Sequence, residues 1–298
     1  MNATSQRNGH LLIIGGHEDR KQDKTILQRF LDLSGGPGAT IAVISAASGV
    51  PEEMWAIYDE AFGTLGVQDR RHLIVTCREH ANDSEVAAQL ANADGIFITG
   101  GDQKRLLANI GGTAFDSALH HAFKVGGACI GGTSAGASAM SGHMLAYGSA
   151  TLQPEKGAAN LGAGLGLVNG VVIDQHFSER HRLARLLTVV AQNPCLQGVG
   201  IDEDTALIIE RGVGIEVIGQ GSVTIIDGRT MHSDMADAAA GERPRLIDVR
   251  LHLLPSGSAY TVVDDDGDDD DACAGRSPAA IRDLLNIITH AAACHEDH

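Results

Sequence analysis

Short, continuous apolar runs that alternate with helix-like segments constrain the fold of this chain more than any other feature. These runs end in glycines or small polar residues, and they are HLLIIGG (10–16), ATIAVISAAS (39–48), RHLIVTC (71–77), DGIFITGG (94–101) and ACIGGTS (128–134). Strands that are apolar at every position are buried on both faces, which is typical of a parallel sheet covered by helices on both sides. The sequence therefore predicts an α/β three-layer sandwich with a mostly parallel central sheet.

The segments between these runs have the apolar spacing of helices. They are 24–34, 51–66, 83–93, 103–110 and 114–126. The second half is less regular and predicts extra hairpins. It contains a glycine-rich excursion at 151–168, a strand at 170–177, a helix at 178–192 and short β-branched runs at 198–227.

The acidic composition bears on partners and on the domain boundary. Against 22 Lys and Arg the chain has 38 Asp and Glu, a net charge of −16, so no basic surface for a nucleic-acid partner is expected. The aspartates of the tract DDDGDDDD (264–271) would repel one another if packed, which predicts a solvated linker. We therefore expect one α/β domain over 1–263, followed by an acidic linker and a terminal helix within 264–298. Solubility accounts for the acidity better than attraction of a cationic substrate.

Cysteine usage and hydropathy favour a cytoplasmic protein. The five cysteines are scattered and without C-x-x-C spacing, which indicates neither a disulfide framework nor a thiolate zinc site. The first 16 residues lack the apolar core of a signal peptide, and no apolar run reaches 18 residues. We expect no membrane association.

The stretch ACIGGTSAGASAM (128–140) places one serine, Ser134, where an apolar strand passes into a helix. Residues 132–136 match G-x-S-x-G, the pattern of a nucleophile elbow. The nucleophile in such an elbow occupies a strained turn, and its neighbours must be small so that the backbones do not collide. The alternative is a tight turn with an N-cap serine. A second strand end, ITGGDQ (98–103), offers backbone N–H groups near Gly101 that would join that of Ala135 in an oxyanion hole.

A nucleophilic serine needs a base, and His176 is the candidate. Among 14 histidines several lie on probable helix faces, whereas VVIDQHF (171–177) places His176 at the end of a buried strand with polar neighbours. The alternative is a structural histidine at a strand end. The carboxylate that orients this imidazole remains open from spacing alone: Asp174, Asp202, Glu203 and Asp204 are candidates. HFSERH (176–181) lacks the H-E-x-x-H arrangement, so we expect no metal and no cofactor.

Several blocks together resemble the cyanophycinase family of serine peptidases, which also includes aspartyl dipeptidase. They are IIGGHEDR (13–20), ITGGDQ (98–103), GGTSAGASAM (131–140), DQHFSERHRLARL (174–186) and GIDEDTAL (200–207), in the family's order. The resemblance runs from about residue 8 to about 263. It implies a class-I-glutamine-amidotransferase-like fold, a homodimer, and hydrolysis of cyanophycin, a poly-aspartate with arginine on each side chain, to β-Asp-Arg dipeptides.

The resemblance also implies roles for individual residues. Ser134 would be the nucleophile, His176 the base and Glu203 the orienting acid. The positions that match the family's substrate-binding blocks are Gln103, Asp174, Gln175, Arg180, Arg182 and Arg185.

Independent chemistry supports the arginines, because each arginine of the polymer keeps a free α-carboxylate, which a guanidinium binds in a bidentate manner. On an ideal helix Arg182 and Arg185 share a face, whereas Arg180 would have to act from the loop or first turn. His17 is a departure, since the family commonly has a small residue there.

Three alternatives remain on sequence grounds. A dipeptidase acting on short aspartyl peptides would keep the fold and change the substrate. An α/β-hydrolase esterase shares G-x-S-x-G, but there the histidine usually follows the acid, whereas here the proposed order is Ser134, His176, Glu203. A catalytically silent binding or storage-granule protein would bind the polymer without cleaving it.

Overall fold

Five parallel strands form one side of the larger sheet, from β1 to the edge strand β3. The computed structural model describes residues 9–262, 281, 285 and 286. Within it the parallel strands lie in the order β1-β5-β4-β2-β3. Their bounds are β1 (His10–Ile14), β2 (Thr40–Ile44), β3 (Asp69–Leu73), β4 (Gly95–Ile98) and β5 (Cys129–Thr133). Four of them coincide with the apolar runs, whereas β3 begins two residues before the run expected at 71–77 and ends at Leu73. The α/β fold is confirmed.

Three antiparallel strands extend this sheet beyond β1, in the order β16-β11-β10-β1. They are β10 (Thr205–Glu210), β11 (Gly214–Gly219) and β16 (Ala259–Thr261). Strand β10 pairs antiparallel with β1. The loop that precedes β10 is thereby brought to the carboxyl end of β1.

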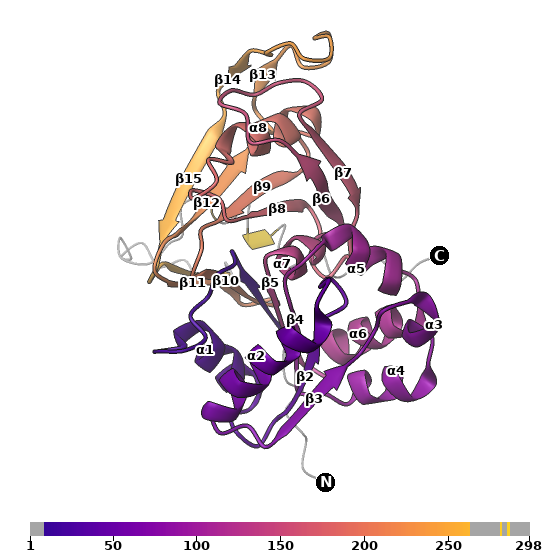
Figure 1. Cartoon of the computed structure of the whole chain (residues 1–298). Coiled ribbons are helices and arrows are strands. Elements are labelled where there is room, and N and C mark those ends of the chain that lie inside the picture. The colour runs from indigo at the N-terminus through magenta and orange to yellow at the C-terminus, as the bar shows by residue number, and fades with distance from the viewer. Residues whose placement is uncertain (1–8, 263–280, 282–284, 287–298) are drawn as a thin grey trace.

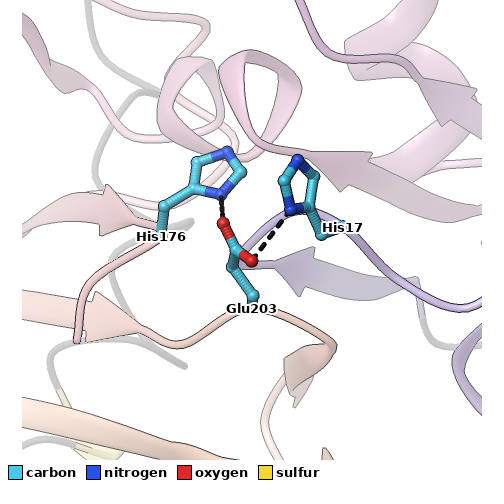
Figure 2. A group of neighbouring side chains, drawn as sticks. All are labelled: His17, His176 and Glu203. Carbon is cyan, nitrogen blue, oxygen red and sulfur yellow. Dashed lines mark hydrogen bonds and ion pairs between the residues drawn. The ribbon is translucent and has the colours of Figure 1, made fainter. Parts of the chain in front are cut away.

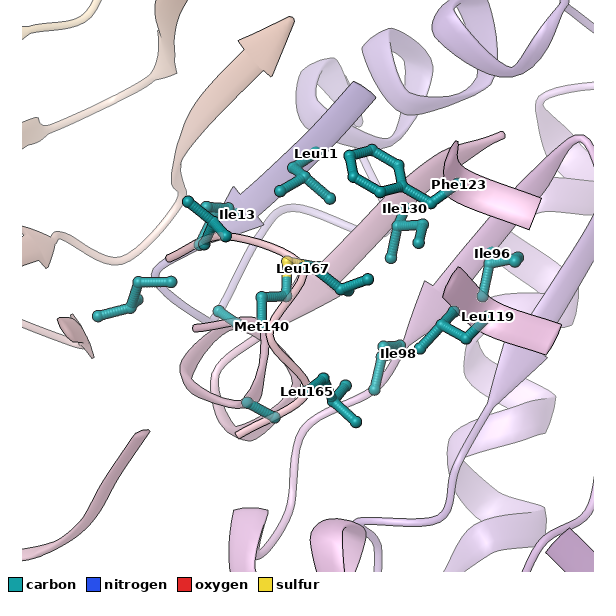
Figure 3. Packing of buried hydrophobic residues seen from close by; sticks show 14 of the residues in the cluster. Leu11, Ile13, Ile96, Ile98, Leu119, Phe123, Ile130, Met140, Leu165 and Leu167 are labelled. Atoms are coloured by element: carbon teal, nitrogen blue, oxygen red, sulfur yellow. The ribbon is translucent and has the colours of Figure 1, made fainter. Parts of the chain in front are cut away.

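Helices cover both faces of the larger sheet because alternate residues of its strands point to opposite sides. On one face Leu12 and Ile14 pack with Phe30 of helix α1, and on the other Leu11 and Ile13 lie in one cluster with Leu119 of α6 (Figure 3). The first face carries α1 (Thr25–Ser34) and α2 (Pro51–Thr64). The second carries α3 (Arg78–Ala81), α4 (Ser84–Ala91), α5 (Gln103–Ile110), α6 (Ala114–Lys124) and α7 (Ala135–Ala139).

A second sheet, in the order β15-β12-β9-β8, packs beyond the carboxyl ends of the parallel strands (Figure 1). It consists of β8 (Val171–Gln175), β9 (Gln197–Ile201), β12 (Ser222–Asp227) and β15 (Arg250–Pro255), with helix α8 (Leu183–Gln192) against it. The pairs β6 (His143–Gly148) with β7 (Ala159–Ala163), and β13 (His232–Ser233) with β14 (Leu246–Ile247), complete the upper part of Figure 1.

Two expectations for the second half are corrected. The stretch at 151–168 is not only an excursion, because β7 lies within it and pairs with β6. Helix α8 begins at Leu183 rather than at 178. His176 and His181 both have positive φ, 48° and 52°, so the chain turns between them before the helix begins.

The expected linker at 264–271 lies outside the described residues, as does most of the expected terminal helix. Of that helix the structure describes Ile281 and Leu285, both buried, and the adjacent residue 286. None of the helices in the described part of the chain has the length and hydrophobicity needed to span a bilayer.

Candidate active site

Ser134 occupies the turn between strand β5 and helix α7. Its backbone has φ 52° and ψ −109°, a conformation that a residue with a side chain adopts only under strain. A Cβ on Gly132 would lie 2.8 Å from the carbonyl of Gly136, and one on Gly136 would lie 2.4 Å from the oxygen of Ile98. The strained turn expected from G-x-S-x-G is therefore present, and only glycine fits on either side of it.

His176 follows the last residue of β8 and reaches Ser134 from the second sheet. Its Nε2 lies 2.9 Å from Oγ of Ser134, and the residue is 3% exposed. The backbone N–H of His176 donates to the carbonyl of Gly15 at 2.7 Å. A Cβ on Gly16 would lie 2.3 Å from Cε1 of the imidazole. The two glycines that follow β1 therefore allow the chain to support both the backbone and the ring of His176.

Of the four carboxylates that spacing left open, the structure brings Glu203 to the imidazole. Oε1 of Glu203 lies 2.6 Å from Nδ1 of His176 (Figure 2). The other three are bound elsewhere: Asp174 to arginine side chains, Asp202 to backbone N–H groups and a serine hydroxyl, and Asp204 to a backbone N–H. Ser134, His176 and Glu203 thus form one hydrogen-bonded series.

The environment of this series keeps the imidazole neutral and the carboxylate charged near neutral pH. Burial lowers the pKa of His176, and the nearby Arg180 charge acts in the same direction, against the hydrogen bond to Glu203. Burial pushes the pKa of Glu203 upward, but hydrogen bonds and charges of His176 and His17 outweigh it and leave this pKa below its ordinary value. A neutral imidazole beside an ionised carboxylate is the protonation state that a general base requires.

Two segments with backbone N–H groups lie beside the serine, the start of α7 and the loop at Gly100 and Gly101. A Cβ on Gly100 would lie 3.4 Å from Cβ of Ser134, so the loop that carries Gly101 lies beside the hydroxyl. Among the described residues no acceptor binds the N–H of Gly101 or of Ala135. Ala135 is also the first residue of α7, where helices leave N–H groups unpaired. Neither N–H group is therefore occupied by another acceptor of the described residues.

Four of the six expected substrate-binding residues contact one another between the end of β8 and the start of α8. Asp174 is fully buried, and its carboxylate accepts two hydrogen bonds from Arg185, one of them 2.7 Å from Nε to Oδ2. Nη1 of Arg182 lies 3.4 Å from Asp174 and 2.7 Å from Oε1 of Gln175. Burial lowers the pKa of Arg182 to about 10. These contacts hold the end of β8 and join the carboxylate of Asp174 to both guanidinium groups.

The remaining two expected residues differ from this buried network. Arg180 is exposed, and among the described residues its guanidinium has no hydrogen-bond or ion-pair partner. It lies in the turn before α8, not within the helix expected over 178–192. Gln103 begins α5, which contacts α7, and its Nε2 donates to the carbonyl of Leu145 at 3.0 Å.

The segment after β1 supplies contacts that sequence reasoning did not foresee. Nδ1 of His17 lies 2.8 Å from Oε2 of Glu203, so this histidine occupies the second oxygen of the carboxylate. Glu18 is buried and accepts hydrogen bonds from the Tyr58 hydroxyl and, at 2.5 Å, from the hydroxyl of Thr133, next to Ser134. The only signal was the paired glycine followed by polar residues, GGHED, at a strand end.

Comparison with known proteins agrees with this architecture. The family model described as Peptidase family S51 matches residues 11–217. Cyanophycinase of Geminocystis herdmanii (strain PCC 6308) is 39% identical over 251 residues, covering 84% of this chain and 92% of the relative. Cyanophycinase of Synechococcus elongatus is 38% identical over 263 residues, covering 87% of this chain and 82% of the relative. A solved peptidase from an acI-B1 Actinobacterium has the same fold, with TM-score 0.64, 20% identity, and coverage of 86% of this chain and 98% of that one.

The family model and the two cyanophycinases define the class of the protein as a hydrolase of peptide bonds. More narrowly, the chain belongs to peptidase family S51.

Proposed function

We propose that this chain is a serine-type peptidase that hydrolyses cyanophycin to β-Asp-Arg dipeptides through an acyl-enzyme. One observation carries the proposal: Oγ of a strained Ser134 lies 2.9 Å from Nε2 of His176, whose Nδ1 lies 2.6 Å from Glu203. This is the arrangement of nucleophile, base and orienting acid that activates a serine. The 36–39% identity to cyanophycinases supports the choice of substrate.

In the proposed reaction Ser134 attacks a carbonyl of the aspartate backbone while His176 accepts the hydroxyl proton. The ionised Glu203 stabilises the imidazolium that forms. The N–H groups of Gly101 and Ala135 hold the oxyanion, one such donor contributing about 3 kcal/mol. His176 then gives its proton to the leaving amine, and water hydrolyses the acyl-enzyme by the reverse proton path.

Arg180 is the arginine best suited to bind a substrate carboxylate. It is exposed and without a partner among the described residues, whereas Arg182 and Arg185 are committed to Asp174. We assign these two a supporting role for the end of β8, together with Asp174 and Gln175. A homodimeric state and a cytoplasmic location are further parts of the proposal, and light scattering on the purified chain tests the first.

The test is product analysis by mass spectrometry after incubation with insoluble cyanophycin, beside Ser134→Ala. We expect β-Asp-Arg from the wild type and a loss of about 10⁶-fold in the variant. If both release the same product, the assigned nucleophile is wrong. If neither does while a fluorophosphonate still labels Ser134, the serine is activated but the substrate is wrong, and short aspartyl peptides become the alternative. A wild-type serine that does not label would favour a silent binding protein.

A further inference from the structure

Two imidazoles converge on the carboxylate of Glu203. Nδ1 of His176 lies 2.6 Å from Oε1, and Nδ1 of His17 lies 2.8 Å from Oε2 (Figure 2). The two rings meet edge to face with centroids 5.1 Å apart. One donor atom from each of the three residues lies within 4.8 Å of the other two.

We propose that these three side chains bind a zinc-class divalent ion, and that this ion inhibits the enzyme. Two imidazole nitrogens and one carboxylate oxygen are a donor set that Zn²⁺ accepts, with water in the fourth position. Ligand atoms on tetrahedral zinc lie roughly 3.3 Å apart, from a Zn–N distance of about 2.0–2.1 Å. The side chain of His17 is 64% exposed, so its ring is free to adjust and solvent reaches the cluster. Mg²⁺ and Ca²⁺ prefer oxygen ligands and should not compete.

The inhibition follows from the tautomer of His176 and rests on the function proposed above. As a base, this imidazole carries its proton on Nδ1 and offers the lone pair of Nε2 to Ser134. A metal on Nδ1 requires that lone pair, so the proton leaves Nδ1 and the neutral ring carries it on Nε2. Nε2 then donates to Oγ instead of accepting from it, and the serine cannot lose its proton. The ion is therefore an inhibitor rather than a cofactor.

His17→Asn removes one of the three proposed zinc ligands, and zinc affinity rather than basal activity is its readout. Asparagine tolerates the positive φ of 52° at this position, and its amide still donates to Glu203 but does not replace an imidazole as a zinc ligand. His181→Asn is the matched control, because His181 is also exposed and also has φ 52°. Tag-free protein is titrated with ZnCl₂ by calorimetry, and fluorophosphonate labelling of Ser134 and cyanophycin hydrolysis are followed over the same zinc range.

We expect one zinc per chain in the wild type and in His181→Asn, with affinity at least about 100-fold weaker in His17→Asn. Labelling and hydrolysis should fall together as zinc binds, and EDTA should restore both. Equal zinc affinity in wild type and His17→Asn would overturn the site. Zinc binding that depends on His17 but leaves Ser134 labelling unchanged would overturn the inhibition. If cyanophycin is not hydrolysed at all, calorimetry and labelling still decide the site and its effect on the serine.

Discussion

Replacing Arg185 by methionine tests whether the buried arginines support the site or bind substrate. Asp174 is 0% exposed and Arg185 is 6% exposed. Removing one partner of such a buried pair costs about 3–5 kcal/mol, because the other charge stays buried and unpaired. Arg182 remains 3.4 Å from Asp174, which places the expected loss at the lower end, about 3 kcal/mol of unfolding free energy.

Urea denaturation measures this loss directly, and the slope of the unfolding free energy against urea concentration should not change. The matched control is Arg180→Met, an exposed arginine five positions earlier, whose unfolding free energy should stay within about 0.5 kcal/mol of wild type. In that control KM for the substrate should rise instead. Adding Asp174→Asn to Arg185→Met should lower the stability further, since it leaves the buried Arg182 without its ion-pair partner. The reasoning is refuted if Arg185→Met unfolds like the wild type and only its KM rises.

Three further predictions concern the catalytic series. In buffer containing EDTA, kcat/KM should rise with pH through a midpoint below 6.5 and then level off, because burial lowers the pKa of His176 and the base works only when neutral. The titratable and charged groups that face the His176 imidazole are Glu203, His17 and Arg180. A midpoint above 6.5 in the pH profile would contradict this. Gly16→Ala should lower kcat about 100-fold, since its methyl would lie 2.3 Å from the imidazole and displace it; steady-state kinetics that match the wild type would show that the ring tolerates the contact. Glu203→Gln should lower kcat about 10⁴-fold without unfolding the chain, and circular dichroism with kinetics checks both parts.

The parallel half of the fold was predictable because its signal is local. Strands β1, β2, β4 and β5 are apolar at nearly every position and are separated by helical patterns. Strand β8 has the same apolar pattern but belongs to the second sheet. The sequence of a buried strand does not show which sheet the strand joins. The pair β6 and β7 has no clear strand pattern in the sequence near the glycine-rich stretch 151–168.

The candidate site likewise has one part that the sequence predicts and another that it does not. The strained turn at Ser134 follows from the size of its neighbours, which sequence shows directly. The choice among Asp174, Asp202, Glu203 and Asp204 depends on how β10 pairs with β1 and on the backbone turn at Asp204, which has φ 45°. Such long-range geometry leaves no trace in spacing. The contact between His17 and Glu203 is hidden for the same reason, since 186 positions separate the two residues.

The origin of the three proposed catalytic residues in different parts of the fold has a consequence for biosynthesis. Ser134 comes from the larger sheet, His176 follows it by 42 positions on the second sheet, and Glu203 follows by a further 27 in the loop that joins the two. A ribosome therefore exposes the serine well before its base and acid exist. The proposed catalytic series therefore forms only after both sheets have folded and docked, so chain order delays its assembly until Glu203 has been synthesised.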